Sequence, residues 1–326
     1  MPLNKFKYLG LLVVLVASAG SGSLTRADER PANAAPAEVP TGPGHILYSC
    51  DGKLYLIDPD GKNERRIGLP PLGGCPPTAC LSPDGRSLAF WTSGDNVFEP
   101  VICVRTLDGE GFGTRFELKE AGGFVRFFWS PDGQDLHVNL GGPAKEARHF
   151  RIDPKTRQVT RLDVLKDYMV SDQTRDGKLF LANPVGSESG WNPKTVHLLT
   201  AAGAEEKLLA DLTLLGDPRG WVAAGRLSPD GRRALVTHNG KPCVIDLDTP
   251  GVLKPVAGIP KDAEVTACAW APDGKHVVYA IGTVHWLAPD DLKKFESRLV
   301  VADPDGGNAK AVRTVTGKVL IDVDWR

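Results

Sequence analysis

The chain has 326 residues, of which 24% are charged, and its formal net charge at pH 7 is −1. This near-neutral balance argues against a nucleic-acid partner, because binding to phosphates needs a clustered positive field. Gly (36) and Pro (26) are frequent and Met (2) is scarce, so the composition favours many tight turns over long helices.

The N-terminus has the pattern of an export signal. Lys5 and Lys7 precede an apolar stretch at 9–19, which fits the core of a signal peptide and is short for a membrane span. Small residues follow, and cleavage after Ala19 and cleavage after Ala27 both agree with them. An uncleaved N-terminal anchor is the competing interpretation. We therefore expect a periplasmic or secreted protein.

Three segments follow from the composition: a signal peptide at 1–27, a linker at 28–43 and a folded domain at 44–326. The linker is rich in Ala and Pro and cannot bury much apolar surface, so we expect it to be flexible. No later segment is apolar over the length that a membrane span needs, so we expect none after signal cleavage.

The folded domain contains a repeated turn between two apolar strands. In this turn, Pro presets φ, Asp bonds the nearby backbone and Gly supplies the left-handed residue that returns the chain. The copies recur at intervals of roughly 45 residues, which is the length of a four-stranded propeller blade. They are Ser82-Pro83-Asp84-Gly85, Ser130-Pro131-Asp132-Gly133, Ser228-Pro229-Asp230-Gly231, the variant Ala271-Pro272-Asp273-Gly274 and the worn copy Thr174-Arg175-Asp176-Gly177.

A second kind of turn follows a further β-rich strand in each repeat. The unit is therefore strand A, first turn, strand B, loop, strand C, second turn and strand D. Six second turns can be counted, at 58–61, 107–109, 153–156, 201–203, 248–251 and 303–306.

Five first turns accompany the six second turns, and the ends of the domain explain the difference. The segment 44–48 begins directly at strand B, whereas 319–326 reads as a strand A whose Trp325 stands where Trp129 and Trp270 stand in full copies. We expect this last strand to complete the first blade and to close an all-β ring of six four-stranded antiparallel blades, which protects the sheet edges. The alternative is an apolar tail that arises by chance.

The pattern Trp-Ser-Pro-Asp-Gly, apolar strand, loop, strand and Asp-Pro-Asp-Gly resembles the TolB-type, WD-like propeller repeat over 44–326. The resemblance implies a β-propeller, but it says little about function, because propellers host unrelated activities. Periplasmic TolB also carries an α/β domain ahead of its propeller, where this sequence has only a short linker.

In such a propeller, the A–B and C–D turns lie on one face and the B–C and D–A loops on the other. The second set is longer and more varied here, and loop variation on a rigid scaffold is where binding residues usually lie. Because aromatic residues and Arg are frequent anchors of interfaces, the candidate partner-binding residues are Phe98, Trp191, Trp221, His285, Trp286 and Arg219. Nearby charge would come from Asp95, Glu99, Glu188, Asp217, Asp290 and Asp291. Trp191 and Trp221 could instead fold back to cover the ends of blades.

We expect a monomeric, non-catalytic binding scaffold that recognises a protein, a peptide or a cell-envelope component through this face. No catalytic, cofactor-binding or metal-binding residues are predicted: the nearest resemblance to a hydrolase nucleophile motif, at 186–190, has Glu188 at the nucleophile position. The alternative is a propeller hydrolase or a lactonase-like enzyme with a metal or carboxylate site at the mouth of the channel.

Six cysteines in an exported chain permit disulfides. Cys75 is hypothesised to pair with Cys50 or with Cys80, and Cys243 with Cys268. The alternative is that some of them are buried thiols that pack as small apolar side chains.

Overall fold

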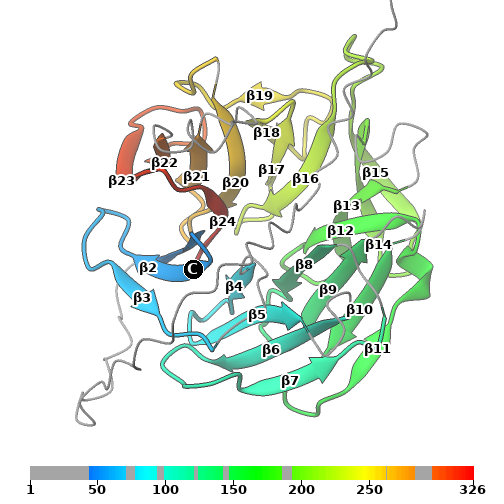
Figure 1. Ribbon diagram of the computed structural model, residues 1–326. Helices are drawn as coiled ribbons and strands as arrows, with labels where there is room; N and C mark the ends of the chain where they lie inside the picture. The colour runs from blue at the N-terminus through cyan, green and yellow to red at the C-terminus, as the bar shows by residue number, and fades with distance from the viewer. Residues whose placement is uncertain are drawn as a thin grey trace, which may run out of the picture.

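The computed structural model describes residues 44–70, 78–93, 99–120, 124–141, 147–185, 193–261, 263–282 and 296–326. Within these ranges the strands form six four-stranded sheets, and the sheets are arranged as blades around a common centre (Figure 1). All neighbouring strands in a blade are antiparallel. The predicted six-bladed propeller is therefore confirmed, whereas the predicted signal peptide at 1–27 and linker at 28–43 lie outside the described residues.

We number the blades in chain order and give their strands from the centre outward. Blade 1 consists of β24 (Leu320–Trp325), β1 (Ile46–Cys50), β2 (Lys53–Ile57) and β3 (Arg65–Ile67). Blade 2 consists of β4 (Ala79–Leu81), β5 (Ser87–Ser93), β6 (Pro100–Thr106) and β7 (Thr114–Glu117). Blade 3 consists of β8 (Phe124–Trp129), β9 (Leu136–Gly141), β10 (Arg148–Ile152) and β11 (Val159–Arg161).

Blade 4 consists of β12 (Tyr168–Gln173), β13 (Leu179–Pro184), β14 (Thr195–Thr200) and β15 (Glu205–Asp211). Blade 5 consists of β16 (Val222–Leu227), β17 (Arg233–His238), β18 (Lys241–Asp246) and β19 (Lys254–Pro255). Blade 6 consists of β20 (Glu264–Trp270), β21 (Val277–Gly282), β22 (Glu296–Ala302) and β23 (Lys310–Thr316). A single 3-10 turn, η1 (Asp163–Leu165), is the helical element of the described chain, in which no helix has the length and apolar character of a membrane span.

The first turns have the geometry that their sequence predicts. In blade 2, the Ser82 hydroxyl accepts the N–H of Ser87 (2.9 Å), and the Asp84 carboxylate accepts the N–H of Arg86 (3.0 Å). Gly85 has φ +69°, a left-handed conformation in which a Cβ would be strained. The same bonds recur in blades 3 and 5, and Thr174 replaces Ser in blade 4. Side-chain chemistry within a few residues therefore sets where each blade turns.

The ring closes through the C-terminal strand. β24 pairs with β1 in a register that places Trp325 opposite Ile46 and Val323 opposite Tyr48. The backbones of His45 and Arg326 exchange two further hydrogen bonds, at 2.5 and 3.1 Å. In Figure 1 the red end of the chain lies directly against its blue beginning. The predicted closure is confirmed, and the alternative of a chance apolar tail is wrong.

Neighbouring blades are joined near the centre by side chains that bond to the backbone of the next blade. Asp324 of blade 1 accepts the N–H of Leu81 in blade 2 (2.9 Å), and Asp172 of blade 4 accepts the N–H of Leu227 in blade 5 (2.7 Å). Asn139 bonds both backbone groups of Val170 across the seam between blades 3 and 4. We call these contacts the inter-blade latches.

The apolar core consists of the layers between blades rather than one central cluster. Trp129 packs between blades 2 and 3, Trp270 between blades 5 and 6, and Trp325 between blades 6 and 1. The indole N–H of Trp270 also donates to the carbonyl of Arg226 in the previous blade (3.1 Å). The repeat tryptophans are therefore interface residues between blades.

The predicted disulfides are wrong. Cys50 and Cys80 are buried free thiols, so neither is bonded to Cys75, which itself lies outside the described residues. Cys243 and Cys268 are also free thiols. They belong to β18 and β20, which are not neighbours in any sheet. Burial raises the pKa of both thiols to about 11, so they pack in the neutral form.

Two buried histidines lie in the layer between blades 3 and 4. His137 Nδ1 and His149 Nε2 are 3.1 Å apart, and the two rings pack against Phe128 and Phe180. Burial lowers the pKa of His137 to about 4, with a further contribution from Arg151, and burial lowers the pKa of His149 strongly. Both histidines are therefore neutral at pH 7.

This pair predicts acid sensitivity. Because the folded protein holds both pKa values below the unfolded value of about 6.5, the contribution to stability is complete above that pH and is lost as the pH falls toward about 4. The double variant His137→Leu/His149→Val carries the residues that stand at the corresponding positions of blade 4, Leu181 and Val196. Urea denaturation at pH 7, 6, 5 and 4 should give a flatter pH dependence for this variant; parallel curves for both proteins would contradict the assignment.

The latch from Asp324 predicts a local stability effect. Asp324→Ala leaves the buried N–H of Leu81 without an acceptor, which should lower the free energy of unfolding by about 1–3 kcal/mol. Asp324→Asn keeps an acceptor oxygen and serves as the matched control, with a smaller expected loss. The measurement is the midpoint of urea unfolding, and an unchanged midpoint in the Ala variant would show that the latch contributes nothing.

Candidate functional site

The structure describes two of the six predicted partner-binding residues. Arg219 is exposed and Trp221 is half-buried, and both lie on the connection between β15 and β16. Phe98, Trp191, His285 and Trp286 lie outside the described residues, as do Asp95, Glu188, Asp290 and Asp291. On the loop face, both described candidates belong to residues 212–221, which we call the 212–221 loop.

Asp217 holds this loop in place. Its Oδ1 accepts the N–H of Gly220 (2.9 Å), and its Oδ2 contacts His238 Nε2 and Asn239 Nδ2, each at 2.9 Å. These hydrogen bonds, led by that of His238, lower the pKa of the carboxyl group. Asp217 therefore has a structural role in this loop, whereas its predicted contribution of charge to a partner contact stays a prediction.

The backbone of the loop is also fixed against blade 5. The Trp221 N–H donates to Asn239 Oδ1 (2.8 Å), and the Asn239 N–H donates to the Trp221 carbonyl (3.0 Å). At Gly220, a Cβ would lie only 2.1 Å from Asp217 Oδ2, so glycine is needed for the carboxylate to reach its partners. The loop is thus a defined structure with several tertiary hydrogen bonds.

This fixed loop presents apolar surface. Leu214 is 79% exposed and Leu215 is 43% exposed, the former the most exposed of the large apolar side chains in the described chain. Asp211 orders their backbone by accepting the N–H of Thr213 (2.8 Å). Sequence reasoning selected Trp and Arg and missed these leucines, because a leucine in a β-rich chain is by default assigned to the core. The sequence did contain a signal for these exposed side chains, because two adjacent leucines stand inside a turn-rich connection.

A second group of polar side chains lies at the centre of the ring, where each innermost strand contacts the innermost strand of the next blade. We call it the channel cluster, and it consists of Arg126, Asp172, Arg226, Asp322 and Asp324. The Arg126 side chain is exposed. The surrounding protein nevertheless removes enough water from its guanidinium to lower the pKa of that group. This combination is expected of a side chain that lines an internal, water-accessible channel.

Bulges direct several of these side chains. The pairing register shifts immediately before Asp172 in β12 and before Arg226 in β16, and it also shifts in β24 near Asp322. A bulge changes the direction in which the following side chain points. Irregular pairing at the centre of the ring therefore changes the direction of charged side chains there.

The charges of the channel cluster interact. Burial raises the pKa of Asp322 to about 6, against the opposing effects of the Ala79 N–H and Arg226. Burial likewise raises the pKa of Asp172, and Arg226 opposes this. Desolvation thus has the largest effect on the pKa values of both carboxyl groups, and the nearby Arg226 guanidinium limits the rise.

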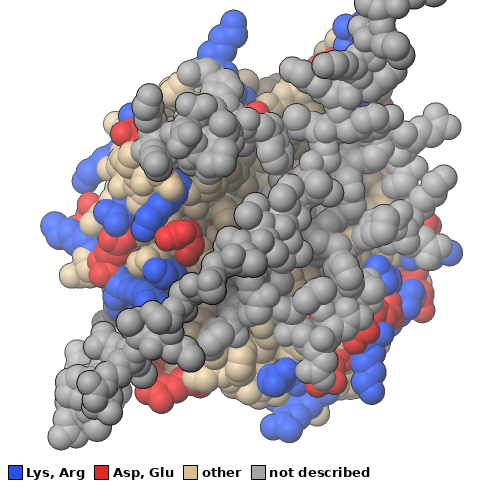
Figure 2. Space-filling model, in the orientation of Figure 1, with Lys and Arg blue, Asp and Glu red and all other residues tan. Residues whose placement is uncertain are grey.

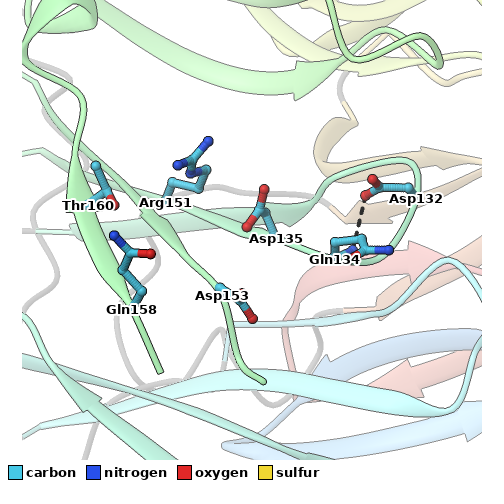
Figure 3. Close-up of a pocket in the computed structure, with 7 residues that line it drawn as sticks. All are labelled: Asp132, Gln134, Asp135, Arg151, Asp153, Gln158 and Thr160. Carbon is cyan, nitrogen blue, oxygen red and sulfur yellow. Dashed lines mark hydrogen bonds between the residues drawn. The ribbon is translucent and has the colours of Figure 1, made fainter. Parts of the chain in front are cut away.

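A pocket of about 300 Å³ lies on the opposite face, between the two turns of blade 3 (Figure 3). Figure 3 shows Asp132 at one end and Arg151 with Thr160 at the other. Asp132 accepts the N–H of Gln134 (3.0 Å), and Asp153 accepts the N–H of Lys155 (2.8 Å). These two carboxylates are thus used to form the turns of blade 3.

Charges on the rim occur mainly as pairs of opposite sign. Glu64 of blade 1 contacts Arg313 of blade 6 (3.1 Å), and Glu120 contacts Arg161 of blade 3 (2.8 Å). On the face drawn in Figure 2, blue and red side chains accordingly alternate around the coloured edge. Among the residues that the structure describes, no three His, Cys, Asp or Glu side chains form a metal-ligand set.

Comparisons with known proteins place the fold. No protein-family model and no curated protein sequence matches the chain. Among solved structures, TolB from Acinetobacter baumannii matches with a TM-score of 0.59 and 20% identity over 86% of this chain and 66% of that chain. A putative TolB from Agrobacterium tumefaciens matches with a TM-score of 0.57 and 14% identity over 87% of this chain and 99% of that chain. Identities this low establish the fold alone, and the chain is a TolB-like six-bladed β-propeller.

Proposed function

We propose that this protein is an exported, monomeric binding scaffold without catalytic activity of its own. It recognises a protein, a peptide or a cell-envelope component through the face that carries the B–C and D–A loops. The observation that carries the proposal is the 212–221 loop, which exposes Leu214 and Arg219 while several hydrogen bonds fix its backbone.

Physical reasoning supports a binding role for such a loop. A rigid apolar surface loses little conformational entropy when a partner covers it, so more of the contact energy appears as affinity. Arg219 and Trp221 beside Leu214 are residue types that often anchor interfaces. The other four candidates, Phe98, Trp191, His285 and Trp286, lie outside the described residues and remain predictions from the sequence.

Photo-crosslinking in envelope extract tests which face binds. A photoreactive amino acid at position 214 should give a discrete crosslinked product. The matched control is the same amino acid at Val252, which is 51% exposed but lies next to a second turn on the opposite face. Equal products from both positions would count against the loop face.

Substitutions in the loop should weaken the interaction without unfolding the protein. Leu214→Ser and Arg219→Ala should each reduce affinity for the crosslinked partner by about 5- to 30-fold, the range expected for an interface anchor. Both side chains are exposed, so thermal unfolding should stay unchanged. Affinity equal to wild type in both variants would exclude the 212–221 loop as the contact.

Export is tested separately by the mature N-terminus. We expect the protein in the periplasm or the medium, with an N-terminus at residue 20 or residue 28 by mass spectrometry. Val14→Asp interrupts the apolar stretch and should retain the precursor in the cell. Full-length protein found outside the cytoplasm with residue 1 intact would instead support an uncleaved anchor.

A further inference from the structure

Arg126 has an unusual position in the protein. It is part of β8, the innermost strand of blade 3, and pairs in register with Asn139 of β9. The Asn139 side chain bonds the backbone of Val170 at 2.7 and 3.2 Å and so joins blade 3 to blade 4. Arg126 therefore lies beside a fixed inter-blade latch on the innermost strand of blade 3, and its side chain is exposed.

The other members of the channel cluster have direct partners. Asp172 and Asp324 accept backbone N–H groups from the next blade, and Asp322 accepts those of Ala79 (3.1 Å) and Val323 (3.0 Å). Arg226 donates to the carbonyl of Ser171 (3.3 Å).

Arg126 differs from all of them. Its guanidinium makes no hydrogen bond and no ion pair with any residue in the described ranges. It is therefore the cluster's unused donor group.

A guanidinium offers paired N–H donors in a planar fork, which matches the two oxygens of a carboxylate. Asp322 is the opposite charge that acts on Arg126 most strongly, but both of its oxygens already accept backbone hydrogen bonds. Arg226 also acts on Arg126, as a like charge. Each oxygen of Asp322 thus already has a backbone donor, and the exposed guanidinium of Arg126 keeps its paired N–H groups for water or a ligand.

The surrounding charges restrict the ligand. Asp172, Asp322 and Asp324 repel a dianion such as phosphate more strongly than a monoanion. The neighbouring thiol of Cys268 adds no charge, because burial raises its pKa to about 11. A monoanionic carboxylate therefore fits better than a phosphate.

We propose that the central channel contains a carboxylate-binding site in which the guanidinium of Arg126 donates two hydrogen bonds to a monoanionic carboxylate. The carboxylate belongs either to a small organic acid or to a polypeptide that enters the channel. The second source rests on the proposed function, whereas the first does not.

Nuclear magnetic resonance of the full folded chain labelled with 15N-arginine tests the site directly. The Arg126 Nε–Hε signal is assigned by its loss in Arg126→Gln, and sodium propionate is then titrated into the wild-type protein. A peptide with a free C-terminal carboxylate and the same peptide as its C-terminal amide are titrated in parallel. We expect a saturable shift of the Arg126 signal and no comparable shift for Arg86, an exposed arginine on a turn of blade 2.

The variants provide the controls. Carboxylate affinity, followed by calorimetry, should fall about tenfold or more in Arg126→Gln and less in Arg126→Lys, which keeps the charge but loses the fork. Arg86→Gln should bind as wild type does. If Arg126→Gln fails to fold, the saturable shift in the wild-type protein still decides the question.

Each outcome has one meaning. Saturation by propionate identifies a small-acid site, and saturation by the free-carboxylate peptide alone identifies a polypeptide ligand. Shifts that rise linearly and equally at Arg126 and Arg86, or equal binding of the amide, overturn the proposal. The crosslinking at position 214 does not involve the channel, so the two proposals fail independently.

Discussion

Every blade of this propeller leaves one edge of its innermost strand unpaired toward the centre of the ring. Backbone N–H groups at such an edge need partners, because a buried donor without an acceptor is costly. Asp172, Asp324 and Asn139 supply these partners from the neighbouring blade. The polar centre of the molecule is thus first a requirement of the architecture: carboxylates and amides replace the ladder of a further strand. This requirement explains why acidic side chains are buried where other blades place apolar ones.

The same requirement shows what Arg126 and the 212–221 loop have in common. In both places the hydrogen-bonding needs of the fold are met by other groups, Asn139 at the seam between blades 3 and 4 and Asp217 in the loop. Arg126, Leu214 and Arg219 are then available for contacts with a ligand. A rigid support with unused groups at its surface is the arrangement that binding sites favour, because the support is organised before the ligand arrives. The propeller therefore offers a peripheral apolar surface and a central charged one on a single frame.

Most of the fold could be predicted from the sequence, because turns such as 82–85 are determined by residues next to one another. The closure could also be predicted, since Trp325 repeats the position of Trp129. The channel cluster could not be predicted, because its members come from four blades and converge only when the ring is closed. One signal was present: Asp172, Arg226 and Asp324 stand directly before the last residue of strand A, where Phe128 and Ala269 are apolar. The disulfide hypothesis failed because Cys50, Cys80 and Cys243 pack as buried thiols in the apolar layers between blades.

The pairing of β24 with β1 joins segments from opposite ends of the described chain. Contacts between such distant segments form slowly during folding, because a very long loop must be closed first. Until then β1 has an open edge, and the β24 of a second molecule matches it as well as its own does. Two copies that folded together at high concentration could therefore exchange their last strands and form a swapped dimer. A monomeric state would thus require each chain to capture its own strand before it meets another copy.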